Sequence, residues 1–128
     1  MLKESIFFRH NGVLKKLNVN DIVILEAADN YIKFFTEEGI FMVRITMNAA
    51  VKSLPSTKFV RVHRLYTVSI KDINTISNEV LTIRDLKDEI PVSKQYYSKF
   101  LKKIKILDAS SSMRNKTVDQ NNQMSLRG

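Results

Sequence analysis

The sequence contains no cysteine and no tryptophan, and only three glycines, two prolines and two histidines among its 128 residues. The absence of cysteine excludes disulfide bonds, thiol nucleophiles and thiolate metal sites. The few glycines leave no Gly-rich loop that could cradle a nucleotide phosphate. Apolar runs extend over only a few residues, far fewer than the roughly 20 that cross a bilayer. The first five residues contain no apolar signal-peptide core, so a cytoplasmic protein is expected.

Residues that could support catalysis are also few. His10 falls in a predicted turn and His63 in a predicted strand, and neither has a serine elbow or a spaced set of acidic ligands around it. Acidic pairs such as Glu37-Glu38 fall at predicted turns, where solvated carboxylates are usual. The sequence therefore predicts no catalytic residue, no cofactor and no metal site, and an enzyme is not expected.

Positive charge is what the sequence has in excess. Lysine and arginine number 21 against 13 acidic residues, which gives a formal net charge of +8 at pH 7. Residues 1–107 hold 18 basic and 11 acidic side chains, a net +7, so the excess belongs to the predicted domain. A basic surface attracts polyanions because neutralised phosphates release their condensed counterions. Charge alone leaves nucleic acid, acidic lipid and a merely solvated basic surface open.

Most of the first 92 residues follow a pattern of short strands separated by turns. Asn11-Gly12 between two strand-like segments is a strong hairpin signal. The apolar run from Ile22 to Ala27 predicts a strand buried on both faces. Further strands are expected at residues 31–36, 40–45, 59–64, 66–70, 72–77, 80–84 and 89–92. The pattern predicts a meander of antiparallel hairpins.

Two segments change to helical spacing. Thr46 is placed to cap a short helix that Pro55 ends, and Ser93 precedes an amphipathic helix expected to extend to about Ile106. Residues 1–107 therefore form one predicted domain, mainly β, with a short mid-chain helix and a C-terminal helix. Residues 108–128 are polar and lack a regular period, which predicts a disordered tail.

Basic and amide side chains gather near the ends of predicted strands. Asn30 falls in a turn, Arg61, His63 and Arg64 close one strand, and Lys94 opens the last helix. Arginine can bridge O6 and N7 of guanine with two donors, and asparagine matches adenine in the same way. A lysine near a helix N-terminus can pair with a phosphate that the terminal amides also attract. Singly, each residue is more often a surface charge or turn-former, and His63 fits a structural hydrogen bond equally well.

The order of these motifs resembles the LytTR family of DNA-binding domains. The matching segments are Asp21 to Ala27 with Asn30-Tyr31, then Phe59 to Arg64, then Ile90 to Lys94. The resemblance extends from about Ile6 to Ile104, and the combination is more specific than any one segment. The sequence departs from the family's usual residues at Leu65 and Ser69, positions that bear on local hydrogen bonding and base preference.

The resemblance implies an elongated sandwich of short antiparallel sheets that regulates bacterial transcription by binding double-stranded DNA in a sequence-specific way. Loops at one edge would enter successive major grooves, and phosphate contacts would cross the minor groove between them. Carried over by position, the groove-facing residues would be Asn30, Tyr31, Arg64 and Lys94, with His63 beside them. Backbone contacts would come from Arg61, Lys33 and Lys99.

The expected partners follow from the same resemblance. Two half-sites on DNA, a homodimer formed there and an upstream sensor protein are all compatible with it, and no membrane contact is expected. Few residues precede the first strand, so no receiver domain fits, and the chain is either a stand-alone regulator, which we favour, or a fragment of a longer one. Two alternatives stay open: a basic β-sheet that binds RNA on exposed aromatic rings, and a protein-interaction module that docks a partner through its terminal helix or tail.

Overall fold

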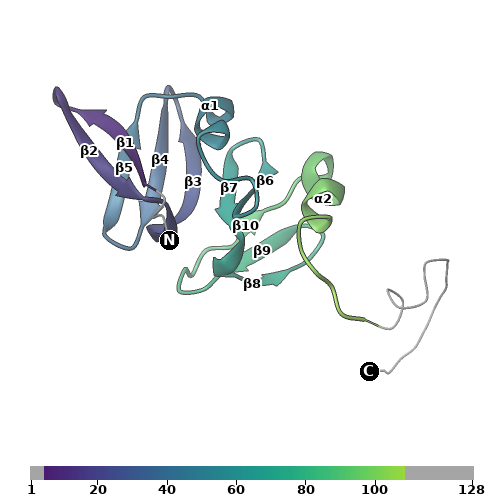
Figure 1. The fold of residues 1–128 in the computed structure, drawn as a ribbon. Coiled ribbons are helices and arrows are strands. Elements are labelled where there is room, and N and C mark those ends of the chain that lie inside the picture. The colour runs from purple at the N-terminus through teal and green to yellow at the C-terminus, as the bar shows by residue number, and fades with distance from the viewer. Residues whose placement is uncertain (1–4, 109–128) are drawn as a thin grey trace.

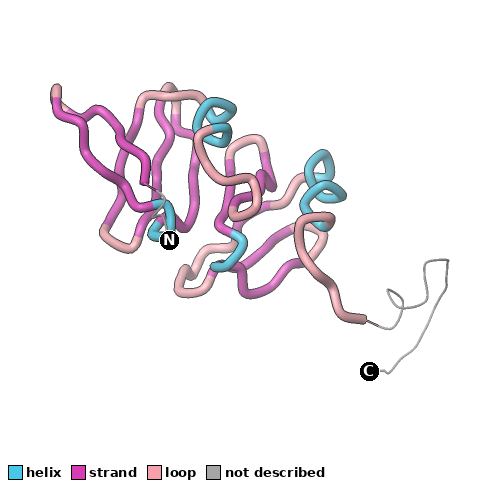
Figure 2. The backbone as a smooth tube through the Cα atoms, in the orientation of Figure 1, coloured by secondary structure: helices cyan, strands magenta, loops and turns pink. Residues whose placement is uncertain are grey.

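A computed structural model describes residues 5–108 of the chain. The predicted tail thus lies outside the described residues, apart from Asp108. Within the described part, the elements follow in the order β1 (Ser5–His10), β2 (Val13–Asn18), β3 (Ile22–Ala28), β4 (Tyr31–Thr36), β5 (Gly39–Val43), α1 (Met47–Lys52), β6 (Phe59–His63), β7 (Tyr66–Ser69), β8 (Ile73–Ile76), β9 (Val80–Ile83), β10 (Ile90–Pro91) and α2 (Lys94–Leu101). Strands predominate along the chain (Figure 2).

The strands form three antiparallel sheets. A two-stranded sheet pairs β1 with β2, a five-stranded sheet has the order β5-β4-β3-β7-β6, and a three-stranded sheet has the order β10-β9-β8. The sheets follow one another from the N-terminal hairpin to α2, which makes the molecule elongated (Figure 1). This arrangement confirms the predicted mainly β fold of short antiparallel sheets with a mid-chain and a C-terminal helix.

The N-terminal hairpin has the turn that its sequence predicts. Asn11 and Gly12 have φ angles of 51° and 77°, the left-handed backbone that a two-residue hairpin turn of type I′ requires. All six residues of β1 pair with the six of β2, from Ser5 with Asn18 to His10 with Val13.

The five-stranded sheet carries an apolar core on each of its faces, because successive side chains of a strand point to opposite sides. On one face, Ile22, Leu25 and Phe34 pack against α1 and the N-terminal hairpin. On the other face, Val62 and Val68 pack against the three-stranded sheet and α2. The first four residues of β3 are buried, as expected of a strand covered on both faces.

The two helices differ in how well the sequence predicted them. The hydroxyl of Thr46 accepts a hydrogen bond from the Ala49 amide at 3.1 Å and caps α1, which confirms that prediction. Ser93 does occupy the N-cap of α2, but its hydroxyl makes no capping bond.

The C-terminal helix ends at Leu101, so its expected extension to about Ile106 is wrong. The amide of Lys103 bonds to the carbonyl of Phe100 at 3.0 Å, a tighter turn that ends the α-helix. The side chains of Lys102, Lys103 and Lys105 are exposed, so little apolar burial supports another helical turn.

Two further differences from the prediction concern one strand and two of the links between strands. The expected strand at residues 89–92 has only two residues in β10, because Pro91 has no amide hydrogen for a longer ladder. Two three-residue 3-10 turns, η1 (Val19–Asp21) and η2 (Ile70–Asp72), were not predicted. They link β2 to β3 and β7 to β8 at the same end of the five-stranded sheet.

Candidate nucleic-acid interface

Three loop segments meet at one end of the five-stranded sheet. They are the β3–β4 turn with Tyr31 (residues 29–31), the β6–β7 turn (residues 64–65) and the start of α2 (residues 93–95). The amide of Ala27, in β3 shortly before the first segment, donates to the Leu65 carbonyl of the second segment at 2.9 Å. The Ser93 amide of the third segment donates at 2.9 Å to the carbonyl of Val62, in β6 shortly before the second segment. We call these three segments the loop edge.

The loop edge brings together the four residues expected to face the grooves. Asn30, Arg64 and Lys94 are exposed, and the Tyr31 side chain is 38% exposed. Within the described residues, neither Arg64 nor Lys94 takes part in an ion pair. Their charges therefore point to solvent, which is the arrangement a polyanion needs.

Arg61 lies behind the β6–β7 turn and uses its guanidinium within the protein. It donates to the carbonyl of Arg64 at 2.7 Å, to Oδ1 of Asn48 at 2.7 Å and more weakly to the carbonyl of His63 at 3.4 Å. Its guanidinium carbon also lies 5.4 Å from the centre of the Tyr96 ring. One side chain thus ties together α1, the turn and α2.

His63 also shapes this turn. Its Nδ1 accepts a hydrogen bond from the Leu65 amide at 3.1 Å. Its ring centre lies 5.7 Å from that of Tyr66. The structural role that the sequence left open for His63 is therefore present in the fold.

Lys33 and Lys99, the other two expected backbone contacts, lie off the loop edge. Lys33 is half-buried in β4, opposite Glu26 of β3, and projects from a face of the sheet. Lys99 is exposed on α2, five residues and about 7.5 Å of helix beyond Lys94.

Two polar residues beside the loop edge were missed from the sequence. The Arg44 guanidinium lies 5.9 Å from the centre of the Tyr31 ring, and Asn48 holds Arg61. Both come from the segment around the start of α1, which follows β5. The alternation of hairpins places the end of β5 at the same end of the sheet as the start of β4, a signal that would have found them.

One carboxylate near the loop edge has a partner of its own. The Tyr66 hydroxyl donates to Oε2 of Glu26 at 3.3 Å, and both side chains are half-buried. Burial, together with the negative charge of Glu26, raises the pKa of Tyr66 above its ordinary value of 10.

The described residues offer little for other kinds of site. Between residues 5 and 108, no three histidine or acidic side chains lie close enough together to hold a metal ion. In the same part of the chain, no helix is long and apolar enough to cross a membrane.

These observations describe a small, mainly β domain with exposed basic and amide side chains on adjoining loops. The LytTr DNA-binding domain family matches residues 12–105, which is most of the chain. The chain belongs to this family.

Two related proteins illustrate the relationship. The sensory transduction protein LytT of Enterococcus faecalis is 24% identical over 88 residues, covering 66% of this chain and 36% of that protein. The chain thus spans about a third of the length of this curated relative. A solved LytTr DNA-binding domain from Bacillus cereus has a TM-score of 0.67 at 24% identity, covering 79% of this chain and 96% of that one. This second similarity shows a shared fold.

Proposed function

We propose that this protein binds double-stranded DNA in a sequence-specific way through the loop edge and thereby regulates transcription. The observation that carries the proposal is the exposure of Asn30, Arg64 and Lys94 on three adjacent loop segments, which two backbone hydrogen bonds at or next to the segments hold close together. Membership of the LytTr DNA-binding domain family supports the same partner.

Each segment brings chemistry that suits a duplex. Arg64 can bridge O6 and N7 of a guanine, Asn30 can pair with an adenine edge, and Lys94 can contact a guanine or a phosphate. We propose that the loops of this edge enter successive major grooves, where all three side chains can reach base edges. Lys33 and Lys99 then flank the edge as backbone contacts.

Arg61 takes a positioning role in this proposal. Each of its three nitrogens already donates a hydrogen bond within the protein, to Asn48 or to the backbone of the β6–β7 turn. A guanidinium in this state holds the turn, and with it Arg64, in one conformation. This positioning role replaces the phosphate contact that the sequence suggested for Arg61.

The test is selection of bound duplexes from a random pool, followed by titration of the selected site between about 50 and 200 mM salt. The expected result is an enriched motif and an affinity that falls steeply with salt. Single-stranded RNA and a scrambled duplex serve as competitors. Preferential binding of the RNA, or affinity without salt dependence, would contradict the proposal.

Two copies on two half-sites are part of the same proposal. Duplexes that carry one or both copies of the selected motif are compared by the protein-to-DNA ratio at saturation. Two copies of protein are expected on the longer duplex and one on the shorter.

A further inference from the structure

The N-terminal hairpin reaches the same end of the molecule as the loop edge. The chain runs along β2 away from the Asn11-Gly12 turn, passes through η1, and returns along β3 to the Asp29-Asn30 turn. Both turns therefore lie at one end, and Figure 1 shows the hairpin next to β5 with its turn at the same end as the tops of β4 and β3. The other ends of β3 and β4 lie at η1 and at the β4–β5 turn.

The hairpin carries positive charge without any negative charge to offset it. Arg9, Lys15 and Lys16 are all exposed, and no acidic residue occurs between residues 5 and 20. By contrast, the β4–β5 turn at the opposite end contains Glu37 and Glu38. A polyanion that lies along the loop edge therefore meets a further attractive surface at the hairpin.

The hairpin is anchored well enough to hold these charges in place. Phe8 and Leu17 are buried in the core beneath it, and the Phe8 ring centre lies 5.4 Å from that of Phe41 in β5. The hairpin is a separate sheet that packs on one face of the five-stranded sheet, with β1 in contact with β5. At the usual spacing of about 10 Å between packed sheets, the hairpin lies beside the loop edge at a distance close to the width of a DNA groove.

We propose that the β1–β2 hairpin is a fourth DNA contact, which binds the phosphate backbone just outside the base pairs met by the β3–β4 turn. This inference rests on the proposed function. Arg9 and Lys16, which share the outer face of the hairpin, are the residues that pair with phosphates. The contact adds affinity and lengthens the bound site without reading its sequence, because phosphates carry no base identity.

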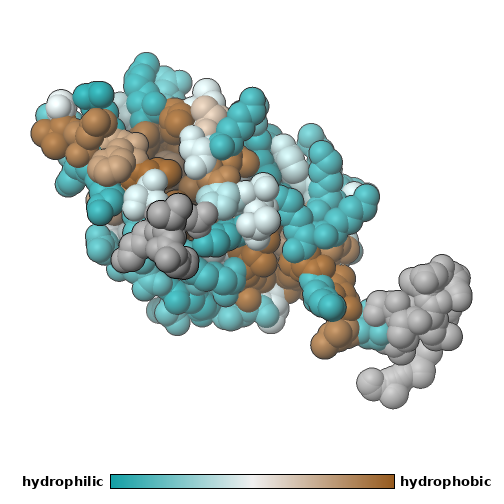
Figure 3. All heavy atoms as spheres, in the orientation of Figure 1, coloured by the Kyte–Doolittle hydropathy of each residue, from teal (hydrophilic) through white to brown (hydrophobic). Residues whose placement is uncertain are grey.

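Exposed apolar side chains accompany the basic ones on the hairpin. Phe7, Val13 and Leu14 are 60%, 59% and 55% exposed, and apolar atoms are visible on the projecting end in Figure 3. An acidic protein surface would also match this composition. The position of the hairpin beside the loop edge favours DNA, and the experiment below separates the two partners.

The experiment crosses a protein variant with the length of the duplex. The selected half-site is prepared with long flanks and with either flank trimmed in turn. Wild-type protein is expected to lose at least about ten-fold in affinity when the flank on the hairpin side is trimmed, because the phosphates that the hairpin contacts are then removed. The double variant R9A/K16A is expected to bind the long duplex as weakly as wild type binds the trimmed one, and to lose no further affinity when that flank is trimmed. Its salt dependence is expected to be shallower by about 2 in logarithmic slope.

The matched control is the double variant K102A/K105A, which removes the same charge from exposed positions beyond α2. It is expected to keep the wild-type response to trimming of the hairpin-side flank. Equal affinity of wild type for long and trimmed duplexes would overturn the inference, and is the result expected if the hairpin serves a protein partner. Failure of wild type to bind any duplex would instead refute the proposed function.

Discussion

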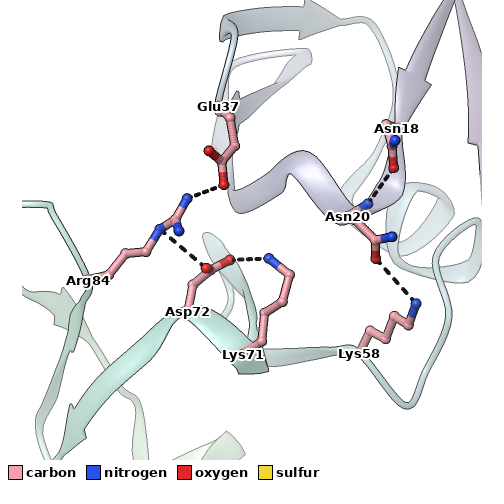
Figure 4. A network of polar contacts seen from close by, with 7 residues as sticks. All are labelled: Asn18, Asn20, Glu37, Lys58, Lys71, Asp72 and Arg84. Atoms are coloured by element: carbon pink, nitrogen blue, oxygen red, sulfur yellow. Dashed lines mark hydrogen bonds and ion pairs between the residues drawn. The ribbon is translucent and has the colours of Figure 1, made fainter.

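The two ends of the five-stranded sheet use charged side chains in opposite ways. At the loop edge, Arg64 and Lys94 are exposed and make no ion pair within residues 5–108. At the other end, Asp72 is 3% exposed and is shared by Lys71 at 3.1 Å and Arg84 at 3.3 Å (Figure 4). Arg84 also pairs with Glu37 of the β4–β5 turn. Charge holds the fold together at one end and is left available to a partner at the other.

The ion pairs of Asp72 and Arg84 also join parts of the chain that are distant in sequence. Arg84 follows β9 of the three-stranded sheet, whereas Glu37 lies between two strands of the five-stranded sheet. The hydrogen bond to Glu37 and the charge of Asp72 raise the pKa of Arg84. The network thus fixes one sheet to the other, and substitutions at the two ends are expected to have separable effects.

The largest effect is expected at Asp72. Replacement by alanine leaves Arg84 and Lys71 without their buried acceptor, and should lower the free energy of unfolding by about 2–3 kcal/mol. Urea denaturation measures this loss, with the exposed Glu79→Ala as a control of equal charge change. DNA affinity of the folded variant should stay within about two-fold of wild type. A variant as stable as wild type would show that the network does not hold the sheets together.

Arg64→Ala is expected to have the opposite effect to Asp72→Ala: DNA binding weakens and the stability of the fold is kept. Binding to the selected duplex should weaken by about 1–3 kcal/mol, with relaxed preference at one base pair, while stability stays unchanged. The comparison of selected and scrambled duplexes measures the specific part of this loss. If both duplexes lost affinity equally, Arg64 would be a phosphate contact and not a base-reading residue.

Arg61→Ala tests the link between fold and interface. Loss of its hydrogen bonds to Asn48 and to the Arg64 carbonyl should cost about 1–2 kcal/mol of stability. Specific DNA binding should also weaken, because the β6–β7 turn loses its support. The salt dependence should stay as in wild type. A slope shallower by about 1 would instead assign Arg61 to a phosphate.

The sequence predicted the strands well, because alternation and turn residues are local signals. Asn11-Gly12 and the buried run in β3 are examples. The sequence predicted the structure poorly where tertiary contacts decide it. An example is the end of α2 at Leu101, which comes earlier than expected. For the interface, residue type and the family resemblance pointed to Asn30, Arg64 and Lys94, which are exposed in the structure and whose role in binding stays a prediction. The inward use of Arg61 was not foreseeable, since it depends on Asn48, 13 residues earlier, and on Tyr96.

The smallest effect is expected at Tyr66. Its hydroxyl donates a hydrogen bond to Glu26, a carboxylate near the loop edge. Tyr66→Phe should lower the free energy of unfolding by about 0.5–1 kcal/mol near neutral pH. The pKa of Tyr66 is raised in the fold, so its contribution is fully present below the ordinary pKa of 10 and is lost as pH rises through the raised value. The stability difference between wild type and Tyr66→Phe should therefore narrow above pH 10, measured by urea denaturation across that range. A difference that stays constant into strongly alkaline solution would mean that the hydroxyl's proton is not what holds Glu26.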